Sequence, residues 1–251
     1  MMSHEKETWY ANWFNDIYAH IYAHRDRLSA NREAAFALTL LGGVPEGPVL
    51  DLCCGAGRHS HALAAAGCRV VGLDLSPWLL SEARSFVASP GGRLSLVRGD
   101  MRSLPFSRAF SGVFNFFTSF GYFDDEENRE VLREIARVLL PGGFFLLDYM
   151  NAPAVIAGLV PCSERETELG KVVESRTYDP ESRRIEKDLY VYRSEGEMEA
   201  YHESVRAYTC EEMLSLLSVV GLCPLSVYGT LDGAAYTEKS PRMVIFGRTC
   251  A

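Results

Sequence analysis

Short apolar runs alternate with helical segments between residues 48 and 147, and this alternation limits the possible folds more than any other feature of the chain. The apolar runs cover residues 49–52, 69–73, 94–97, 112–117 and 144–147. Helical patterning falls between them, at about residues 60–66, 77–88 and 124–139. An alternation of strands and helices predicts a doubly wound, mostly parallel sheet with helices on both faces.

After residue 151 the pattern changes to segments that are rich in Val, Tyr and charged residues. Three of them, at 171–178, 184–192 and 199–208, predict an antiparallel β insertion with turns at Asp179-Pro180 and Glu195-Gly196. Thr209 is expected to cap a helix over 211–220. Two final strands, at 222–228 and 243–247, would return to the main sheet and bring it to seven strands.

Aromatic residues and Ile near the N-terminus recur every four positions in two adjacent rows. The rows are Trp9, Trp13, Ile17, Ile21 and Tyr10, Phe14, Tyr18, Tyr22. This spacing predicts one helix with a broad apolar face, which packs on the domain or on a second copy of the chain. A second helix is expected at about 31–41, ending at Gly42-Gly43. The predicted parts are a helical cap (1–47), an α/β core (48–158), the insertion (159–208) and a C-terminal helix with strands (209–251).

The 251 residues carry 25 Lys and Arg against 33 Asp and Glu, a formal net charge of −8. This charge disfavours nucleic acid and anionic membranes as partners. No apolar run approaches the roughly 18 residues of a membrane-spanning helix, and the segment MMSHEKETWY does not resemble a signal peptide. The seven cysteines lack zinc-type spacing, and the pairs His20/His24 and His59/His61 lack a third ligand. We therefore expect a protein of the reducing cytoplasm that binds no metal.

A glycine-containing turn follows the first predicted strand and leads into a helix. Gly55 and Gly57 lack Cβ atoms, so a ligand can approach the backbone closely, and the helix N-terminus offers unpaired N–H groups. Asp74 stands seventeen residues after Gly57, at the end of the next strand. A carboxylate at that position can accept hydrogen bonds from both hydroxyls of a ribose.

Two residues of this turn argue against a nicotinamide or flavin dinucleotide. Ser60 occupies the position of the third glycine of the dinucleotide motif, and Asp51 lies four residues before Gly55. A pyrophosphate would be repelled by Asp51, whereas a cofactor with an ammonium and a sulfonium group would be attracted. After the third strand, Asp100 can accept a hydrogen bond from the amine of adenine while Met101 packs on the ring. A nucleotide-dependent oxidoreductase stays the alternative enzyme.

With these motifs, residues 48–151 resemble the class I S-adenosylmethionine-dependent methyltransferases. The resemblance rests on the D-x-C-C-G-x-G turn, the G-L-D-L-S-P and G-D-M runs, and a helix-P-G-G-strand sequence, which occur in the order and spacing of the family. Cys53 departs from the glycine that many members carry. The resemblance implies a Rossmann-like methyltransferase fold, S-adenosylmethionine as cofactor and methyl transfer to a small molecule.

The resemblance also implies roles for individual residues. Asp51, Gly55 and Gly57 would line the methionine end, Asp74 would hold the ribose, and Asp100 with Met101 would hold adenine. The end of the fourth strand would pass beside the methyl group, and Tyr18 or Tyr22 would cover the cofactor. The full set expected at the cofactor is Tyr18, Tyr22, Asp51, Cys53, Gly55, Gly57, Asp74, Leu75, Asp100, Met101, Asn115 and Phe116.

Four residues are candidates for the acceptor side: His202 as a general base, Arg206 as a carboxylate ligand, and Tyr122 and Tyr208 as pocket residues. The insertion would be a substrate lid or a homodimer contact. The acidic run 124–127 suits a helix start better than a metal site, and Cys162 follows the fifth strand, where no base-methylating nucleophile is expected. A cofactor-binding sensor without catalysis remains the alternative from another class of protein.

Overall fold

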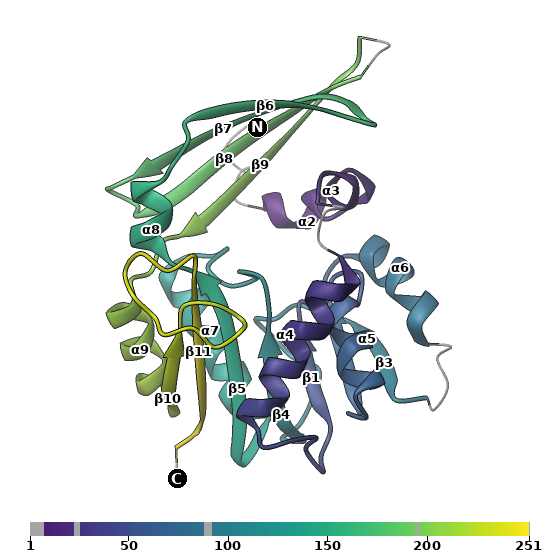
Figure 1. Cartoon of the computed structure of the whole chain (residues 1–251), viewed down its shortest axis with the longest axis vertical. Helices are drawn as coiled ribbons and strands as arrows, with labels where there is room; N and C mark the ends of the chain where they lie inside the picture. The colour runs from purple at the N-terminus through teal and green to yellow at the C-terminus, as the bar shows by residue number, and fades with distance from the viewer. Residues whose placement is uncertain (1–7, 23–25, 88–91, 194–195, 251) are drawn as a thin grey trace.

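The computed structural model describes residues 8–22, 26–87, 92–193 and 196–250. Its centre is a seven-stranded sheet with the strand order β10-β11-β5-β4-β1-β2-β3 (Figure 1). The strands are β1 (Val49–Leu52), β2 (Val70–Asp74), β3 (Leu94–Arg98), β4 (Phe110–Asn115), β5 (Leu139–Met150), β10 (Leu222–Tyr228) and β11 (Arg242–Thr249). Strands β1 to β5 pair in parallel, while β11 pairs antiparallel with both β5 and β10. The predicted doubly wound, seven-stranded fold is confirmed.

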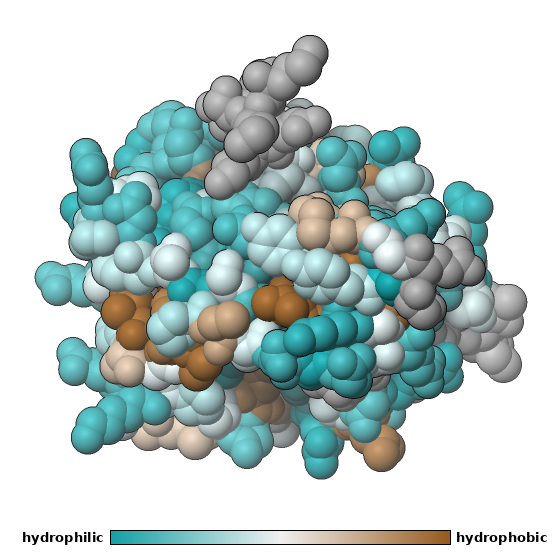
Figure 2. Space-filling view, turned by 90° about the horizontal axis from the view of Figure 1, so that it is seen from above, coloured by the Kyte–Doolittle hydropathy of each residue, from teal (hydrophilic) through white to brown (hydrophobic). Residues whose placement is uncertain are grey.

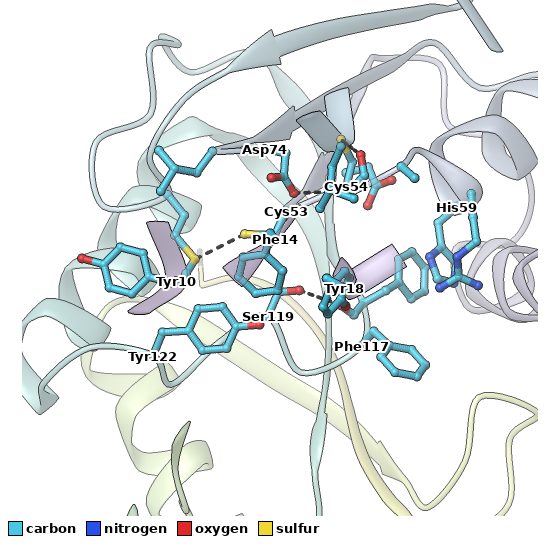
Figure 3. Close-up of a pocket in the computed structure, with 18 of the residues that line it drawn as sticks. Tyr10, Phe14, Tyr18, Cys53, Cys54, His59, Asp74, Phe117, Ser119 and Tyr122 are labelled. Carbon is cyan, nitrogen blue, oxygen red and sulfur yellow. Dashed lines mark hydrogen bonds between the residues drawn. The ribbon is translucent and has the colours of Figure 1, made fainter. Parts of the chain in front are cut away.

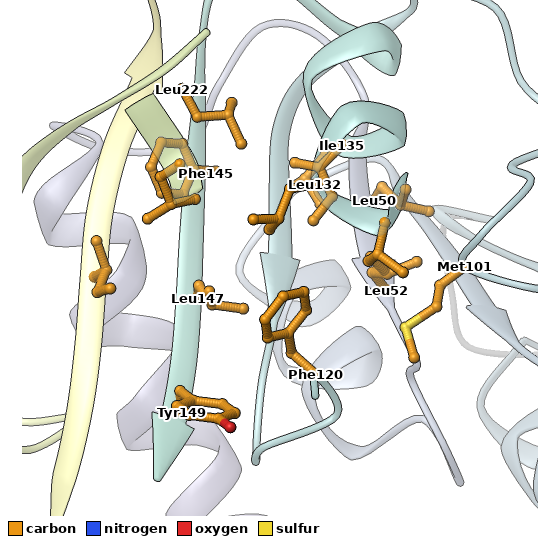
Figure 4. Packing of buried hydrophobic residues seen from close by; sticks show 14 of the residues in the cluster. Leu50, Leu52, Met101, Phe120, Leu132, Ile135, Phe145, Leu147, Tyr149 and Leu222 are labelled. Carbon is orange, nitrogen blue, oxygen red and sulfur yellow. The ribbon is translucent and has the colours of Figure 1, made fainter. Parts of the chain in front are cut away.

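Helices cover both faces of this sheet because the side chains of each strand alternate between them. On one face lie α4 (Arg27–Leu40) and α5 (Arg58–Ala65), and on the other lie α7 (Asp125–Val138) and α9 (Cys210–Val219). The helix α6 (Pro77–Val87) packs beside β3. Figure 4 shows Leu132 and Ile135 of α7 against Leu50 and Leu52 of β1. Because β1 to β5 run in parallel, their carboxyl ends lie at one edge of the packed sheet.

Local signals set several of the helix boundaries. The Asp124 side chain accepts the Glu127 N–H at the start of α7, so the acidic run begins a helix as predicted. Thr209 and Glu212 form a reciprocal capping box at the start of α9. The largest differences from the predicted boundaries of the core are that α4 begins at Arg27, where Asp26 caps it, and that β5 starts directly after α7 rather than at residue 144. The predicted end of α6 at 88 and part of the turn at Glu195 lie outside the described residues.

The N-terminal aromatic segment is two short helices, not the one helix that the spacing predicts. They are α2 (Trp9–Trp13) and α3 (Asp16–Ile21), separated at Phe14 and Asn15. Asn15 has an extended backbone, and its side chain accepts the Tyr18 N–H. A side chain of this kind competes with the helical backbone, which explains the break. The buried row survives the break, since Trp9, Trp13, Ile17 and Ile21 form one cluster.

The insertion forms a separate antiparallel sheet, which we call the second sheet. It follows α8 (Ala152–Ala157) and has the order β6 (Cys162–Thr167), β7 (Gly170–Asp179), β8 (Arg184–Tyr192) and β9 (Met198–Arg206). The strand β6 was not predicted, and β9 ends at Arg206 rather than at 208. In Figure 1 the helices α2 and α3 lie between this sheet and the core. Seen from above, the molecule presents a mainly hydrophilic face with smaller hydrophobic areas (Figure 2).

The antiparallel pairing of β10 with β11 brings Cys223 and Cys250 together in a disulfide, which the sequence did not predict. The other five cysteines are free thiols. Across the described ranges, no helix is long and apolar enough to cross a membrane. No group of three His, Cys, Asp or Glu side chains in the same ranges is arranged to hold a metal ion.

Candidate active site

A cavity of about 210 Å³ lies at the carboxyl ends of the parallel strands, beneath α2 and α3 (Figure 3). Its lining comes from the segments that follow β1, β2, β3 and β4 and from the two short helices. Ten of the twelve residues expected at the cofactor line it: Tyr18, Tyr22, Asp51, Cys53, Gly55, Asp74, Leu75, Asp100, Met101 and Phe116. The strand-end positions therefore converge as the topology requires.

The turn after β1 has a backbone that suits glycine at several positions. Gly55 and Gly57 have φ values of 55° and 76°, and Cys53 has a φ of 60°. A left-handed conformation is uncommon for a residue with a side chain and is concentrated at functional sites. Glycine adopts this conformation without strain, which suits the glycine that the resemblance implies at position 53. Gly57 itself caps α5 and does not line the cavity.

Asp74 is held in place by two backbone groups at the end of β2. Its carboxylate accepts the N–H groups of Gly55 and Ser76, each at 2.8 Å. The residue is only 7% exposed, and burial raises the pKa of this carboxyl above its usual value. These two hydrogen bonds hold the carboxylate beside the cavity, where it can accept hydrogen bonds from hydroxyl groups of a ligand.

Asp51 is buried at the end of β1 and lines the same cavity. Burial raises the pKa of its carboxyl, while a hydrogen bond from the Ser60 hydroxyl favours the charged form. Ser60 lies in the first turn of α5. The serine that breaks the dinucleotide motif is thus the residue that orients Asp51.

Asp100 and Met101 form the side of the cavity after β3. Although partial burial opposes ionisation, hydrogen bonds from Arg102 hold the pKa of the Asp100 carboxyl below its usual value. Arg102 also binds Glu127 at 2.6 Å. The Met101 sulfur lies 3.5 Å from the Cys53 sulfur, so the two residues close the floor of the cavity together.

Several cavity residues were not predicted from the sequence. Tyr10 and Phe14 extend the aromatic cover formed by Tyr18, and Phe14 stacks on Tyr122 with ring centroids 6.0 Å apart. His59 stacks on Phe116 at 4.1 Å and binds Glu33 at 2.6 Å. The four-residue spacing contained the signal for Tyr10 and Phe14. The position of His59 beside the glycine turn was the available signal for that residue.

Asn115 does not line the cavity. Its amide donates to the Leu52 carbonyl at 3.0 Å, and the residue borders a small separate void beside Val113 and Leu147. Its buried Oδ1 has no hydrogen-bond partner. Asn115 thus borders this void rather than the cavity that Phe116 lines, and its expected contact with the cofactor stays a prediction.

A second pocket, of about 790 Å³, adjoins the cavity. The two share Tyr10, Tyr122 and Phe123 as a common wall. The rest of the second pocket is mainly polar and is formed by Thr8, Trp9, Arg102, Asp124, Glu127, Thr177, Arg184, Glu186, Asp188, His202 and Ser204. Desolvation raises the pKa of the Tyr122 hydroxyl well above its usual value, so this group stays neutral.

His202 lines the second pocket with both ring nitrogens occupied. Nε2 lies 2.9 Å from Glu186 and Nδ1 lies 2.7 Å from Asp188. The hydrogen bond with Glu186, and then that with Asp188, raises the pKa of His202, although burial opposes this. The imidazolium form is therefore favoured, and this arrangement leaves no nitrogen free to accept a substrate proton.

Arg206 and Tyr208 line neither pocket. Arg206 is 6% exposed and binds Asp125 at 3.1 Å, and its guanidinium also donates to the Ala207 carbonyl. The Tyr208 hydroxyl donates to Asp125 at 2.6 Å. Both residues fasten β9 and the following loop to the start of α7, and their expected substrate contacts stay predictions.

The strand order and the acidic, aromatic cradle at its carboxyl edge define an α/β protein that binds a nucleoside-containing cofactor. Residues 49–143 match the family model of a methyltransferase domain. The chain is 31% identical over 201 residues to the cypemycin N-terminal methyltransferase of a Streptomyces species, covering 78% of this chain and 81% of that protein. It is 38% identical over 108 residues to a demethylmenaquinone methyltransferase of Clavibacter sepedonicus, covering 43% and 42%.

A solved S-adenosylmethionine-dependent methyltransferase from Clostridium acetobutylicum has the same fold, with a TM-score of 0.79 and 17% identity over 94% of this chain and 97% of that one. The chain belongs to the class I S-adenosylmethionine-dependent methyltransferases. It is an enzyme, and S-adenosylmethionine is its methyl donor. The oxidoreductase and the non-catalytic sensor are thereby set aside.

Proposed function

We propose that this enzyme transfers the methyl group from S-adenosylmethionine, bound in the cavity beneath α2 and α3, to a nitrogen atom of a small molecule or peptide end in the second pocket. The observation that carries this proposal is the wall shared by the two pockets. An acceptor and a methyl donor that meet at the edge of this wall, with no side chain between them, would be close enough to react. Methyl transfer depends mainly on such positioning.

The cavity residues fit the parts of this cofactor. Asp74 would receive the ribose hydroxyls, and Asp51 with the Gly55 turn would surround the charged methionine end. The Met101 side chain would pack on adenine, with Asp100 at its edge. The aromatic rings of Phe14, Tyr18 and Tyr122 would face the sulfonium, whose positive charge they attract. When bound, the cofactor supplies an electrophilic methyl group on a cationic sulfur.

The charge of the second pocket favours an amine as the acceptor. Four carboxylates (Asp124, Glu127, Glu186 and Asp188) line it, against two guanidinium groups (Arg102 and Arg184) and His202. Arg102 is already paired with Asp100 and Glu127. An excess of carboxylates attracts a cation such as an ammonium group.

The amine must lose a proton before its lone pair can attack. The Asp188 side chain is 39% exposed and can accept a hydrogen bond from the ammonium group. The ammonium proton can pass to the Asp188 carboxylate or to water. The new N–C bond then forms as the C–S bond of the cofactor breaks. In this scheme His202 positions Asp188 and Glu186 rather than acting as the base.

The relatives support nitrogen as the target atom. The cypemycin enzyme is named for methylation of an N-terminus, and its match extends over 78% of this chain. The quinone-methylating relative matches only 43% of the chain. A quinone also fits poorly beside the charged lining of the second pocket.

Two pairs of probes test this proposal with S-adenosylmethionine labelled on the methyl group. Each pair contains a free amine and its N-acetylated form: glucosamine with N-acetylglucosamine, and tetra-alanine with its acetylated form. We expect label only in the free amines, on nitrogen by mass spectrometry, and less of it in the Asp188→Asn variant. Glu164→Gln on the exposed edge strand β6 is the matched control. Label on carbon or oxygen, or equal labelling of acetylated probes, would contradict the proposal.

The division into four parts at residues 47, 158 and 208, the cytoplasmic location and the homodimer stay predictions from the sequence. We further propose that the second sheet acts as the substrate lid, because β8 and β9 contribute Glu186, Asp188 and His202 to the second pocket. Sedimentation of the protein at several concentrations tests the homodimer. If the protein forms a dimer whose interface fills the second pocket, the second sheet cannot act as the substrate lid.

A further inference from the structure

We propose that Glu203 and Lys187, which line neither pocket, are positioning residues that hold the aromatic helices α2 and α3 closed over the cofactor. They lie opposite each other on β9 and β8 of the second sheet. The proposal rests on the assignment of the cavity as the cofactor site. It gives the second sheet a part in cofactor binding, in addition to its part in acceptor binding.

Glu203 is the point at which both short helices are attached. Its Oε1 accepts the Trp13 indole N–H at 2.6 Å and the Tyr22 hydroxyl at 3.2 Å. Trp13 ends α2, and Tyr22 directly follows α3. One carboxylate oxygen therefore ties together two segments that Phe14 and Asn15 separate. Hydrogen bonds to a charged acceptor are stronger than those to a neutral one.

Lys187 completes this attachment from the neighbouring strand. Its ammonium donates to the Tyr22 hydroxyl at 2.5 Å and lies 3.5 Å from each Glu203 oxygen. Lys187 is 8% exposed, and its second carboxylate neighbour, Glu174, is 2% exposed. A buried charge of this kind is tolerated only with its partners in place. The geometry of the group is thus strongly specified.

The opposite side of the aromatic helices is attached to the core. The Ser76 hydroxyl donates to the Phe14 carbonyl at 2.6 Å, and the Ser76 N–H is bound to Asp74. The cover is therefore held on one side by Ser76, which is hydrogen-bonded to the proposed ribose ligand Asp74. On the other side it is held by Glu203 and Lys187.

Both helices need these attachments because they are short. The helix α2 has five residues and α3 has six, and helices of this length are not stable in water by themselves. The segment supplies Tyr10, Phe14, Tyr18, Ala19 and Tyr22 to the cavity. If the closed arrangement is less populated, the apparent cofactor affinity falls by the same fraction. Glu203 thereby controls cofactor retention without touching the cofactor.

Calorimetric titration with S-adenosylhomocysteine tests this in the full chain. Glu203→Ala should weaken binding by about 10-fold or more, since it removes two hydrogen bonds to a charged group. Glu203→Gln keeps an acceptor oxygen for Trp13 and Tyr22, so it should restore binding to within about 3-fold of the parent. Trp13→Phe, which removes the indole donor and leaves a smaller aromatic ring, should fall between these values. Glu164→Ala on β6 is the control and should leave binding unchanged.

A double-variant comparison separates positioning from a general loss of stability. In a Trp13→Phe/Tyr22→Phe background, Glu203→Ala should change the dissociation constant by less than about 2-fold, because both donors from the aromatic helices are already absent. Undiminished weakening there would overturn the proposal. So would parent-like binding by Glu203→Ala in a protein with an intact melting transition.

Asp74→Ala, measured in parallel, distinguishes the two levels of the argument. If Asp74→Ala binds like the parent, the cavity is not the cofactor site and the proposed function fails. If Asp74→Ala weakens binding and both Glu203→Ala and Trp13→Phe do not, only the positioning role fails. Trp13→Phe keeps an aromatic ring at this position and leaves the buried charges in place, so it answers the question even if Glu203→Ala does not fold.

Discussion

The two sheets of this enzyme differ in how they use their side chains. In the main sheet, all four residues of β1 are buried, and the ligand-facing groups stand where the strands end. In the second sheet, functional side chains stand along the strands. On β8, Lys187, Leu189 and Val191 are buried on the side of the aromatic helices, while Glu186 and Asp188 face the second pocket.

This difference separates two ways of building a site. A parallel sheet buried on both faces can present polar groups only at its edge. An antiparallel sheet can carry a different function on each face, because successive side chains point to opposite sides. The cofactor cradle therefore depends on the topology of the main sheet, and the proposed acceptor side depends on the register of β8 with β9.

A matched pair of core substitutions is expected to give the largest effect. Leu132→Ala in α7 should lower the free energy of unfolding by about 3–5 kcal/mol, because Leu132 is fully buried against the main sheet. Leu189→Ala in the second sheet should cost less, since its cluster is smaller and can relax around the gap. Urea denaturation measures both. Equal losses would mean that the two sheets unfold as one equally packed unit.

Asp74→Ala is expected to weaken S-adenosylhomocysteine binding by about 10- to 100-fold, as two hydroxyl groups lose a buried acceptor. Calorimetry measures this change. Asp179→Ala, at an exposed turn of the second sheet, is the control and should bind normally. If Asp179→Ala bound S-adenosylhomocysteine more weakly than Asp74→Ala does, the cofactor would not bind at the edge of the main sheet.

Arg206→Ala should lower the free energy of unfolding by about 1–3 kcal/mol, because a nearly buried guanidinium loses its bonds to Asp125 and to backbone carbonyls. Cofactor affinity should not change, since Arg206 lines neither pocket. Thermal unfolding and calorimetry together measure these quantities. If Arg206→Ala lost cofactor affinity but kept its stability, Arg206 would be part of the binding site.

The smallest effect concerns pH. Hydrogen bonds with Glu186 and Asp188 raise the pKa of His202 above its ordinary 6.5. The protonated form is therefore favoured in the folded protein, and its stabilising contribution is complete below about pH 6.5 and lost as the pH rises through the raised pKa. His202→Gln should flatten this part of the stability curve, measured by urea denaturation at several pH values. An unchanged curve would show that the pair of carboxylates does not depend on the imidazolium.

Much of the cofactor side could be predicted because its signals are local. Asp51 and Asp74 lie at the ends of recognisable strands and Asp100 follows one, and parallel strands place their carboxyl ends at one edge. Gly57 and Asn115 belong to the same segments, yet they do not line the cavity. The turn geometry decides which way Gly57 faces, and the packing of β4 decides which way Asn115 faces. A sequence motif does not contain this information.

The four residues expected at the acceptor do not all lie together. Tyr122 and His202 line the second pocket, whereas Arg206 and Tyr208 bind Asp125, about eighty positions earlier in the chain. The break between α2 and α3 was also missed, because the four-residue spacing does not show that Asn15 binds the Tyr18 N–H. In each case the side chain forms a hydrogen bond with a group that the local sequence pattern does not indicate.

By itself, the sequence determined the doubly wound core, the order of its strands along the chain and the three carboxylates at its edge. These features follow from hydrophobic period and from turn residues, which act over a few positions. Only the tertiary structure decided that Glu203 and Lys187 meet Trp13 and Tyr22, which lie far away in the sequence. The physical reason is that a polar side chain leaving water must find a partner, and folding brings within reach groups that no local pattern relates.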